Sequence, residues 1–320
     1  MSFLRKAWLP AGFALIIGLT LRIYFAVAVP IAGESKPGEL SSYNDEIAHA
    51  NYTDFLLKHH ALPAQVEPID APGALQRGSF ENYQPPLYYL LHSLTAALWM
   101  ERDFKSIVLT GRFLSILFGI LLIPVFFLIA RELQLSSAAI AAGLIFLSIS
   151  GILIRFQAAC TNDSLFWLLI GISYWIALRL QHSERHFRYW MLFTAVVSLA
   201  LYTKLSALLL IPLPLLIVLR RKSSAKLLHW GIALGCIILL TLPVWIRNLN
   251  DFGGLLPLHA GFGSPAWRMP ALSSMLFSFR SLIFPWSEFW QGIVGIILIS
   301  IPFIIVLVLR YRNSQGQRIG

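Results

Sequence analysis

The chain has 320 residues, of which 57% are hydrophobic and only 12% charged, and its mean hydropathy is +0.71. A soluble domain averages about 25% charged residues and roughly 45–50% apolar ones. This composition excludes an ordinary soluble protein and indicates an all-α integral membrane protein that forms a single unit over residues 1–320. The net charge of +10 sits in short clusters between apolar runs, which is typical of cytoplasmic loops and argues against a nucleic-acid partner.

The first apolar segment follows Arg5 and Lys6 and imitates a secretory signal peptide. Its apolar run contains Arg22 and is longer than the roughly 7–15 residues of a signal-peptide core. We therefore predict an uncleaved first transmembrane helix. Seven later runs reach or approach the length that crosses a bilayer. They predict further spans at 113–130, 138–160, 164–181, 189–203, 205–219, 227–246 and 289–309, or about eight transmembrane helices in all.

The segment 84–100, "QPPLYYLLHSLTAALWM", is ambiguous because it is short for a crossing and opens with two prolines. If it lies along the surface, the later basic clusters fall on the same side as Arg5 and Lys6. If it crosses, those clusters, including "RRKSSAK", move outside and violate the positive-inside rule. We therefore predict that both termini are inside, with outer loops at 33–111 and 247–288. The first loop should carry two interfacial helices, at 45–60 and 86–100.

Ionisable side chains crowd the start of the first outer loop in "SSYNDEIAHANYTDF". Asp45 and Glu46 open the first interfacial helix, where a carboxylate can also serve as an ordinary helix cap. Glu81 lies before the two prolines, and Asp163 begins a helix at the same membrane face. His49, His59 and His60 could ligate a metal with these carboxylates, although a His-His pair at a helix end is more often a solvated terminus.

Basic residues accompany these acids where the positive-inside rule does not favour them. Arg112, Lys204 and Arg247 all fall at the predicted outer ends of apolar segments. A carboxylate can take a proton from an attacking hydroxyl, and a cation can stabilise a departing phosphate. The pattern therefore favours glycosyl transfer from a lipid phosphate on the non-cytoplasmic face of the cytoplasmic (inner) membrane. Hydrolysis of an ester or peptide would need a Ser or Cys nucleophile with a His, and no such set is evident.

Several ordered motifs resemble the GT-C superfamily of polyprenyl-phosphate-sugar-dependent glycosyltransferases. The nearest branches are the protein O-mannosyltransferases and the aminoarabinose transferases that act on lipid A. The motifs are "NDEIAHANYTDFLLKHHALP", "ENYQPPLYYLL", "GRFLSILFGILLIPVFFLIARELQ", "TNDSLFWLL", "LYTKLSALLLIPLPLL" and "LPVWIRNLNDFGGLLP", in family order over roughly residues 10–260. Each motif alone is weak evidence, but the ordered series is strong.

The resemblance implies a role for each of the outer residues. It implies that Asp45 is the catalytic carboxylate or base, accompanied by Glu46, and that Asp163 matches the second outer acidic position of the catalytic site. Lys204, Arg247 and Arg112 match cations of the donor-phosphate site. Glu81 is similar to a glutamate that can hold a divalent metal ion, and the reaction is expected to invert the sugar.

The implied partners are a polyprenyl-phosphate-sugar donor, membrane lipids and a lipid, glycan or protein acceptor. Relatives usually carry several more helices than the one that follows "RNLNDFGG" in this chain. That difference leaves open a partner subunit, a minimal enzyme or a degenerate paralogue. Two other functions stay open: a non-enzymatic binder or translocator of lipid-linked sugars, and an accessory subunit of a larger transferase.

Overall fold

The computed structural model describes residues 2–31, 45–64, 81–98, 103–182, 186–214, 224–252 and 254–255, and every regular element in these ranges is helical. This confirms the all-α prediction for that part of the chain. The elements are α1 (Ser2–Ala28), α2 (Glu46–His59), α4 (Leu87–Ala97), α5 (Phe104–Glu132), α6 (Ser137–Ile149), α7 (Gly151–Gln157), α8 (Asp163–His182), α9 (His186–Leu201), the 3-10 helix η1 (Leu205–Leu210) and α11 (Ser224–Phe252).

Within the described ranges, four helices are long and apolar enough to cross a membrane, so the protein is a multi-pass membrane protein. The spans are Ala11–Ala28, Phe104–Glu132, Asp163–Leu180 and Leu227–Phe252. Helices α6 and α7, bent by 54° at their junction, form a fifth if they act as one broken span. The predicted span 205–219 begins instead as η1 and runs out of the described residues, and 289–309 lies wholly outside them. The count of eight therefore stays a prediction.

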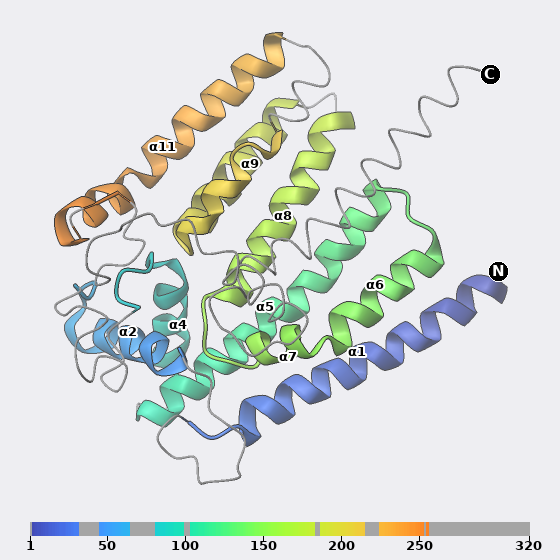
Figure 1. The fold of residues 1–320 in the computed structure, drawn as a ribbon, viewed down its shortest axis with the longest axis horizontal. Helices are drawn as coiled ribbons and strands as arrows, with labels where there is room; N and C mark the ends of the chain where they lie inside the picture. Colours follow the sequence, from blue (N-terminus) through green and yellow to red (C-terminus); the bar gives the residue numbers. More distant parts are fainter. Residues whose placement is uncertain are drawn as a thin grey trace, which may run out of the picture. The chain divides into compact units, whose positions relative to one another are not determined.

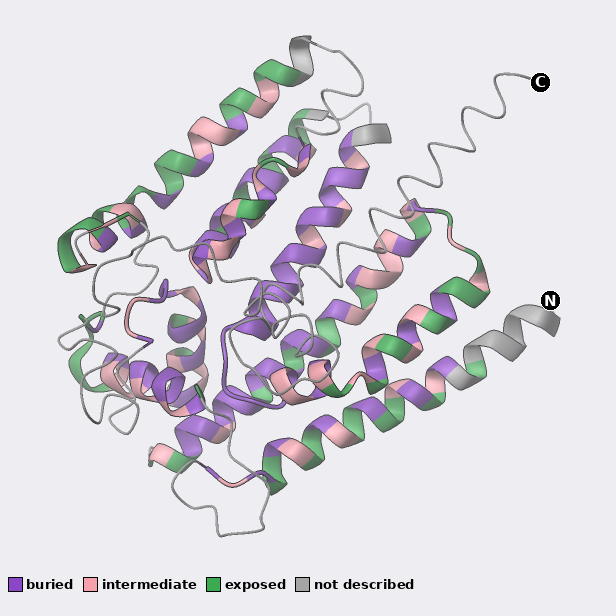
Figure 2. Ribbon diagram, viewed as in Figure 1, coloured by how far each residue is buried: buried purple, intermediate pink, exposed green. Residues whose placement is uncertain are grey.

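The long helices pack in an order that differs from their order in the chain (Figure 1). Helix α1 contacts α6 and α5, α5 contacts α8, α8 contacts α9, and α9 contacts α11. Figure 2 shows α8 almost wholly buried, while α11 exposes much of its surface. In the most apolar stretch of each helix, 83% of α8 is buried but only 22% of α11. Helix α8 thus lies at the centre of the described bundle, whereas α11 exposes many of its apolar side chains.

Helices α2 and α4 occupy the two segments for which interfacial helices are predicted. They pack on each other and on α5, at one end of the bundle (Figure 1). Gly111 of α5 permits this approach, because a Cβ there would collide with Cys160 and His92. The Leu87 amide also donates to the Tyr202 carbonyl at 2.8 Å, which ties the start of α4 to the end of α9. The position of α2 and α4 relative to a membrane stays a prediction.

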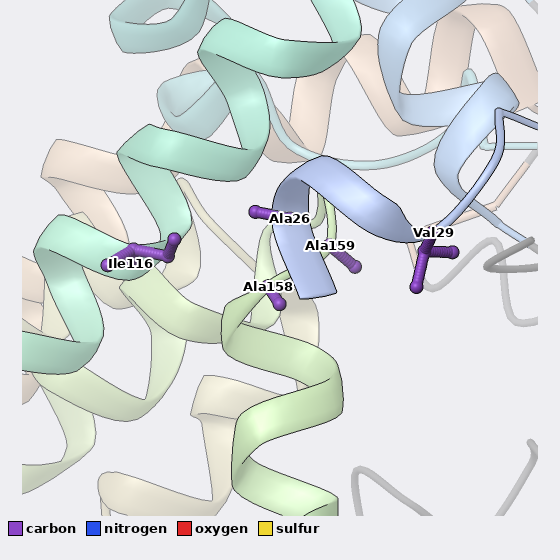
Figure 3. Close-up of a cluster of buried hydrophobic side chains, with 5 residues drawn as sticks. All are labelled: Ala26, Val29, Ile116, Ala158 and Ala159. Carbon is purple, nitrogen blue, oxygen red and sulfur yellow. The ribbon is translucent and has the colours of Figure 1, made fainter. Parts of the chain in front are cut away.

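The end of α1 is held against α5 by small buried side chains. Figure 3 shows Ala26 and Val29 of the α1 end with Ile116 of α5 and Ala158 and Ala159, which follow α7. Three of these five residues are alanines, so the backbones approach closely. This packing brings the carbonyl groups at the end of α1 within reach of α5, where the functional groups begin.

Arg22, the cation inside the first span, is buried at the junction of α6 and α7. Its Nη1 and Nη2 donate to the carbonyls of Ser148 and Leu147, at 2.7 and 2.8 Å. Its Nε donates to Gln157 Oε1 at 2.7 Å. The last carbonyls of a helix carry partial negative charge and lack intrahelical partners. Arg22 therefore stabilises the break between the two helices, which accounts for an arginine at this depth.

Candidate functional site

Glu46 and Arg112, two of the predicted site residues, form an ion pair that is sealed inside the protein. Arg112 Nε donates to Glu46 Oε1 at 2.7 Å, Nη2 donates to Oε2, and both side chains are 1% exposed. Arg112 Nη1 also donates to the carbonyls of Ala26 and Val29, at 2.8 and 2.7 Å. The Cys160 amide donates to Glu46 Oε1 at 2.9 Å. The pair thus joins α1, α2, α5 and the segment before α8, with little room for a substrate group.

The second pair, Asp163 and Lys204, is more open. Lys204 Nζ lies 2.6 Å from Asp163 Oδ1, and the side chains are 25% and 11% exposed. Asp163 is the first residue of α8, and Lys204 lies between α9 and η1. The Asp163 carboxylate binds an ammonium group that lies 41 residues further along the chain. Asp163 therefore holds the Lys204 ammonium group, while part of the lysine side chain stays accessible.

Asp45 lies at the start of α2 and is exposed. It occupies the N-cap position, yet its side chain makes no capping hydrogen bond. The carboxylate acts electrostatically on the second pair. Burial alone would lower the pKa of Lys204, but Asp163, Glu81 and Asp45 outweigh it and the pKa is raised. Lys204 is therefore a fully charged ammonium group among three acidic side chains.

Glu81 lies in a turn before α4 and is buried. Burial, reinforced by the negative charge of Asp45, raises the pKa of Glu81 to about 8, although a hydrogen bond from Gln84 opposes the shift. Gln84 Nε2 donates to Glu81 Oε2 at 2.7 Å. Glu81 therefore holds a proton at neutral pH unless a cation compensates its charge.

Arg247, near the end of α11, is occupied by backbone carbonyls of the first outer loop. Its Nη1 donates to Gln84 at 3.0 Å, and its Nη2 donates to Asn82 and Pro63 at 2.7 and 3.0 Å. The structure thus brings Arg247 beside the Glu81 turn, where it fastens both described sides of the loop to α11. To bind a phosphate directly, it would have to exchange some of these hydrogen bonds.

A metal ion is the one cofactor that the sequence implies here, through Glu81. Among the residues that the structure describes, no group of three His, Cys, Asp or Glu side chains could hold a metal ion. Glu81 itself is engaged by Gln84, and His59 and His60 are exposed at the far end of α2. The side chains in place do not form a ready metal site, so no step of the chemistry below passes through one.

An apolar pocket of about 450 Å³ lies between η1 and α11. Its lining consists of Leu201, Leu208, Ile211, Ile237, Ile238, Thr241, Leu242, Trp245 and Leu255. Lys204 immediately precedes η1, and Arg247 follows Trp245 by two residues in α11. Two of the three predicted phosphate-binding cations, Lys204 and Arg247, thus lie next to or within the segments that form the pocket.

Three residues of this end of the bundle were missed by the sequence reasoning: Tyr89, Thr161 and His92. Each is buried and each hydrogen-bonds to another element, His92 to Thr53 at 2.8 Å and Tyr89 to His49 at 2.7 Å. The only local signal was that polar side chains recur in runs otherwise apolar enough to be buried. Such positions are functional or structural candidates because each must find a partner.

Comparison with known proteins gives one match. The model of the family described as dolichyl-phosphate-mannose-protein mannosyltransferase matches residues 83–246, just over half of the chain. The matched range contains Arg112, Asp163 and Lys204 but begins after Asp45 and Glu81. No curated protein and no solved structure matches the chain.

Proposed function

Since the chain belongs to the dolichyl-phosphate-mannose-protein mannosyltransferase family, which consists of membrane glycosyltransferases of the GT-C type, we propose that it uses a polyprenyl-phosphate-sugar donor. It transfers the sugar to an acceptor hydroxyl on the non-cytoplasmic face of the membrane. The observation that carries the proposal is the set formed by Lys204 with Asp163, Asp45 and Glu81. A charged ammonium group there is matched to a lipid phosphate, and an exposed carboxylate to the acceptor.

Asp45 is the proposed base because its carboxylate is exposed and is not used as a helix cap. It takes the proton of the acceptor hydroxyl as the oxygen attacks the anomeric carbon. The bond between that carbon and the phosphate oxygen breaks, the lipid phosphate leaves with the bonding electrons, and the sugar is inverted. Lys204 stabilises the negative charge that grows on the leaving phosphate.

The sealed residues have a supporting part in this proposal. Glu46 follows Asp45 at the start of α2. Its carboxylate accepts hydrogen bonds from Arg112 and the Cys160 amide, and Arg112 also donates to the Ala26 carbonyl. We assign them to fixing the start of α2, and Arg247 to fixing the Glu81 turn. The pocket between η1 and α11 is suited to the first isoprene units of the donor, because it is apolar and adjoins Lys204.

The test combines two variants with a matched control in cells that lack the native protein. Asp45→Asn should lower transfer by about 10²- to 10⁴-fold, the usual contribution of a general base. Lys204→Ala should lower both transfer and binding of undecaprenyl phosphate. Asp54→Asn, which removes another acid of α2 that pairs with Lys58, is the control and should leave transfer unchanged. Mass spectrometry of the envelope glycoconjugates measures transfer.

Two results would contradict the proposal. If Asp45→Asn transfers normally while Lys204→Ala does not, Asp45 is not the base. If glycoconjugates do not depend on the protein at all while undecaprenyl phosphate still binds, the chain is a lipid-phosphate binder and not a transferase.

A further inference from the structure

A chain of buried hydrogen bonds runs from α4 to the Asp163–Lys204 pair. Tyr89 Oη lies 2.7 Å from His49 Nδ1, and His49 Nε2 lies 3.5 Å from Thr161 Oγ1. Thr161 Oγ1 lies 3.2 Å from Asp163 Oδ2. Tyr89, on α4, is 0% exposed and His49, on α2, is 3% exposed. These hydrogen bonds therefore link three segments that are distant in the sequence, and the last of them reaches the carboxylate that holds Lys204.

The direction of each bond follows from the chemistry of the groups. Asp163, paired with Lys204, accepts on both oxygens, so the Thr161 hydroxyl proton points at Oδ2. Thr161 Oγ1 can then only accept from His49, which places the imidazole proton on Nε2. The other ring nitrogen, Nδ1, must be the acceptor of the Tyr89 hydroxyl. Burial lowers the pKa of His49 to about 3, so the ring is neutral as this tautomer requires.

We propose that His49 is a positioning residue that acts through Thr161 to fix the Asp163 carboxylate, and thereby the Lys204 ammonium, for phosphate binding. The proposal rests on the proposed function and extends it, because it gives different roles to Asp163 and Asp45, two of the three acids around Lys204. Every donor in the chain points toward Asp163, whose oxygens are both occupied. Asp163 is therefore the acid that holds the cation, and Asp45 is left as the acid that meets the acceptor.

The same helices supply a matched control. Thr53 Oγ1 lies 2.8 Å from His92 Nδ1, and His92 Nε2 lies 2.8 Å from the Ile107 carbonyl. Thr53 and His92 are buried, as Thr161 and His49 are, but His92 binds a backbone carbonyl of α5 and this pair does not reach Asp163. Removing the Thr53 hydroxyl thus costs a hydrogen bond of the same kind, and its other contact is the backbone carbonyl of His49 and not the imidazole that reaches Thr161.

The experiment measures binding of undecaprenyl phosphate to the full chain in nanodiscs, with undecaprenol as the phosphate-free reference. Thr161→Val should raise the Kd for undecaprenyl phosphate about five- to tenfold and change the Kd for undecaprenol by less than about twofold. Thr161→Ser, which keeps the hydroxyl, should restore binding. Thr53→Val should lower the Tm but leave the ratio of the two Kd values as in the wild type.

Substitutions of His49 test the tautomer itself. Gln places its NH₂ group near the position of Nε2 and should keep the donor to Thr161, so His49→Gln should bind undecaprenyl phosphate nearly as the wild type does. Asn reaches only the position of Nδ1, so His49→Asn should show the loss seen in Thr161→Val. The Tm of each variant is recorded, so that a variant that fails to fold is not counted.

The outcomes distinguish a failure of the positioning role from a failure of the proposed phosphate site. If Thr161→Val lowers the Tm but keeps the ratio of Kd values, the chain of hydrogen bonds is only structural and the positioning role is overturned. If Lys204→Ala itself leaves the Kd for undecaprenyl phosphate unchanged, the proposed phosphate site is wrong. The loss in Thr161→Val together with rescue in Thr161→Ser supports the positioning role.

Discussion

Two of the ion pairs at the same end of the bundle differ in what surrounds them. In the pair of Glu46 and Arg112, protein groups occupy both carboxylate oxygens and all three guanidinium nitrogens, and the side chains are 1% exposed. In the pair of Asp163 and Lys204, a quarter of the lysine side chain is exposed. A satisfied pair stabilises an arrangement of helices, whereas an accessible ammonium can exchange part of its partner set for a ligand.

The difference also explains which residue types stand where. The planar guanidinium of Arg112 reaches a carboxylate and two carbonyls at once, which suits a junction of several segments. The ammonium of Lys204 is a compact charge on a flexible stem, which suits a site that must hold a phosphate and release it. The closed pair therefore belongs to the scaffold and the open pair to the proposed chemistry.

Breaking the closed pair should have the largest effect on stability. Glu46→Gln leaves the Arg112 guanidinium buried without its counter-charge, which costs about 3–5 kcal/mol. The variant should express poorly or unfold at a much lower temperature, as measured by thermal unfolding in nanodiscs. Combining it with Arg112→Met should recover part of the loss, because no buried charge is left. An unfolding temperature like that of the wild type in Glu46→Gln would show that the pair is not part of the scaffold.

Lowering the pH should have the next largest effect, because it reduces stability through the buried histidines. Burial lowers the pKa of His92 to about 4, while an unfolded chain titrates near 6.5. Between these values the unfolded state binds more protons at this residue, so the contribution of His92 to stability falls as pH falls below about 6.5 and is level above it. The expected loss is roughly 1 kcal/mol from pH 7 to pH 5.5 for this residue, and His49 adds to it in the same direction.

Thermal unfolding measured from pH 5 to pH 8 checks the acid effect. His92→Gln should make the dependence shallower, with the contribution of His49 left, whereas His59→Gln, at an exposed residue of α2, controls for the loss of any imidazole. A dependence that is equally steep in both variants would contradict the assignment to buried histidines.

An exposed pair should matter least and completes the series. Lys58 Nζ lies 2.6 Å from Asp54 Oδ2, as close as in the open pair, but the lysine is 66% exposed. Lys58→Ala should change the free energy of unfolding by about 0.5 kcal/mol or less, because solvent and side-chain entropy cancel most of the attraction. A larger change would show that distance, and not burial, decides the strength of these pairs.

Much of the fold could be predicted from local patterns. The all-helical class, the first span and the segments that form α2 and α4 follow from apolar length, helical spacing and the basic clusters. The break between α6 and α7 could not be predicted, because Arg22 stabilises it from a helix more than a hundred residues away. The short helix η1 likewise replaced the start of a predicted span, since its apolar composition alone does not distinguish a 3-10 turn from a crossing.

The candidate site divides in the same way. The charged residue types placed Asp45, Asp163, Lys204 and Glu81 in one outer site, and in the structure the three acids act electrostatically on Lys204. Their roles in the chemistry stay a prediction. The sequence alone determined this inventory, because the cost of burying charge makes each such residue stand out in an apolar chain. Only the tertiary structure decided that Glu46 and Arg112 are sealed, that Arg247 binds loop carbonyls and that His49 reaches Asp163 through Thr161. Those partners are backbone groups or side chains far away in sequence, so no local pattern can carry them.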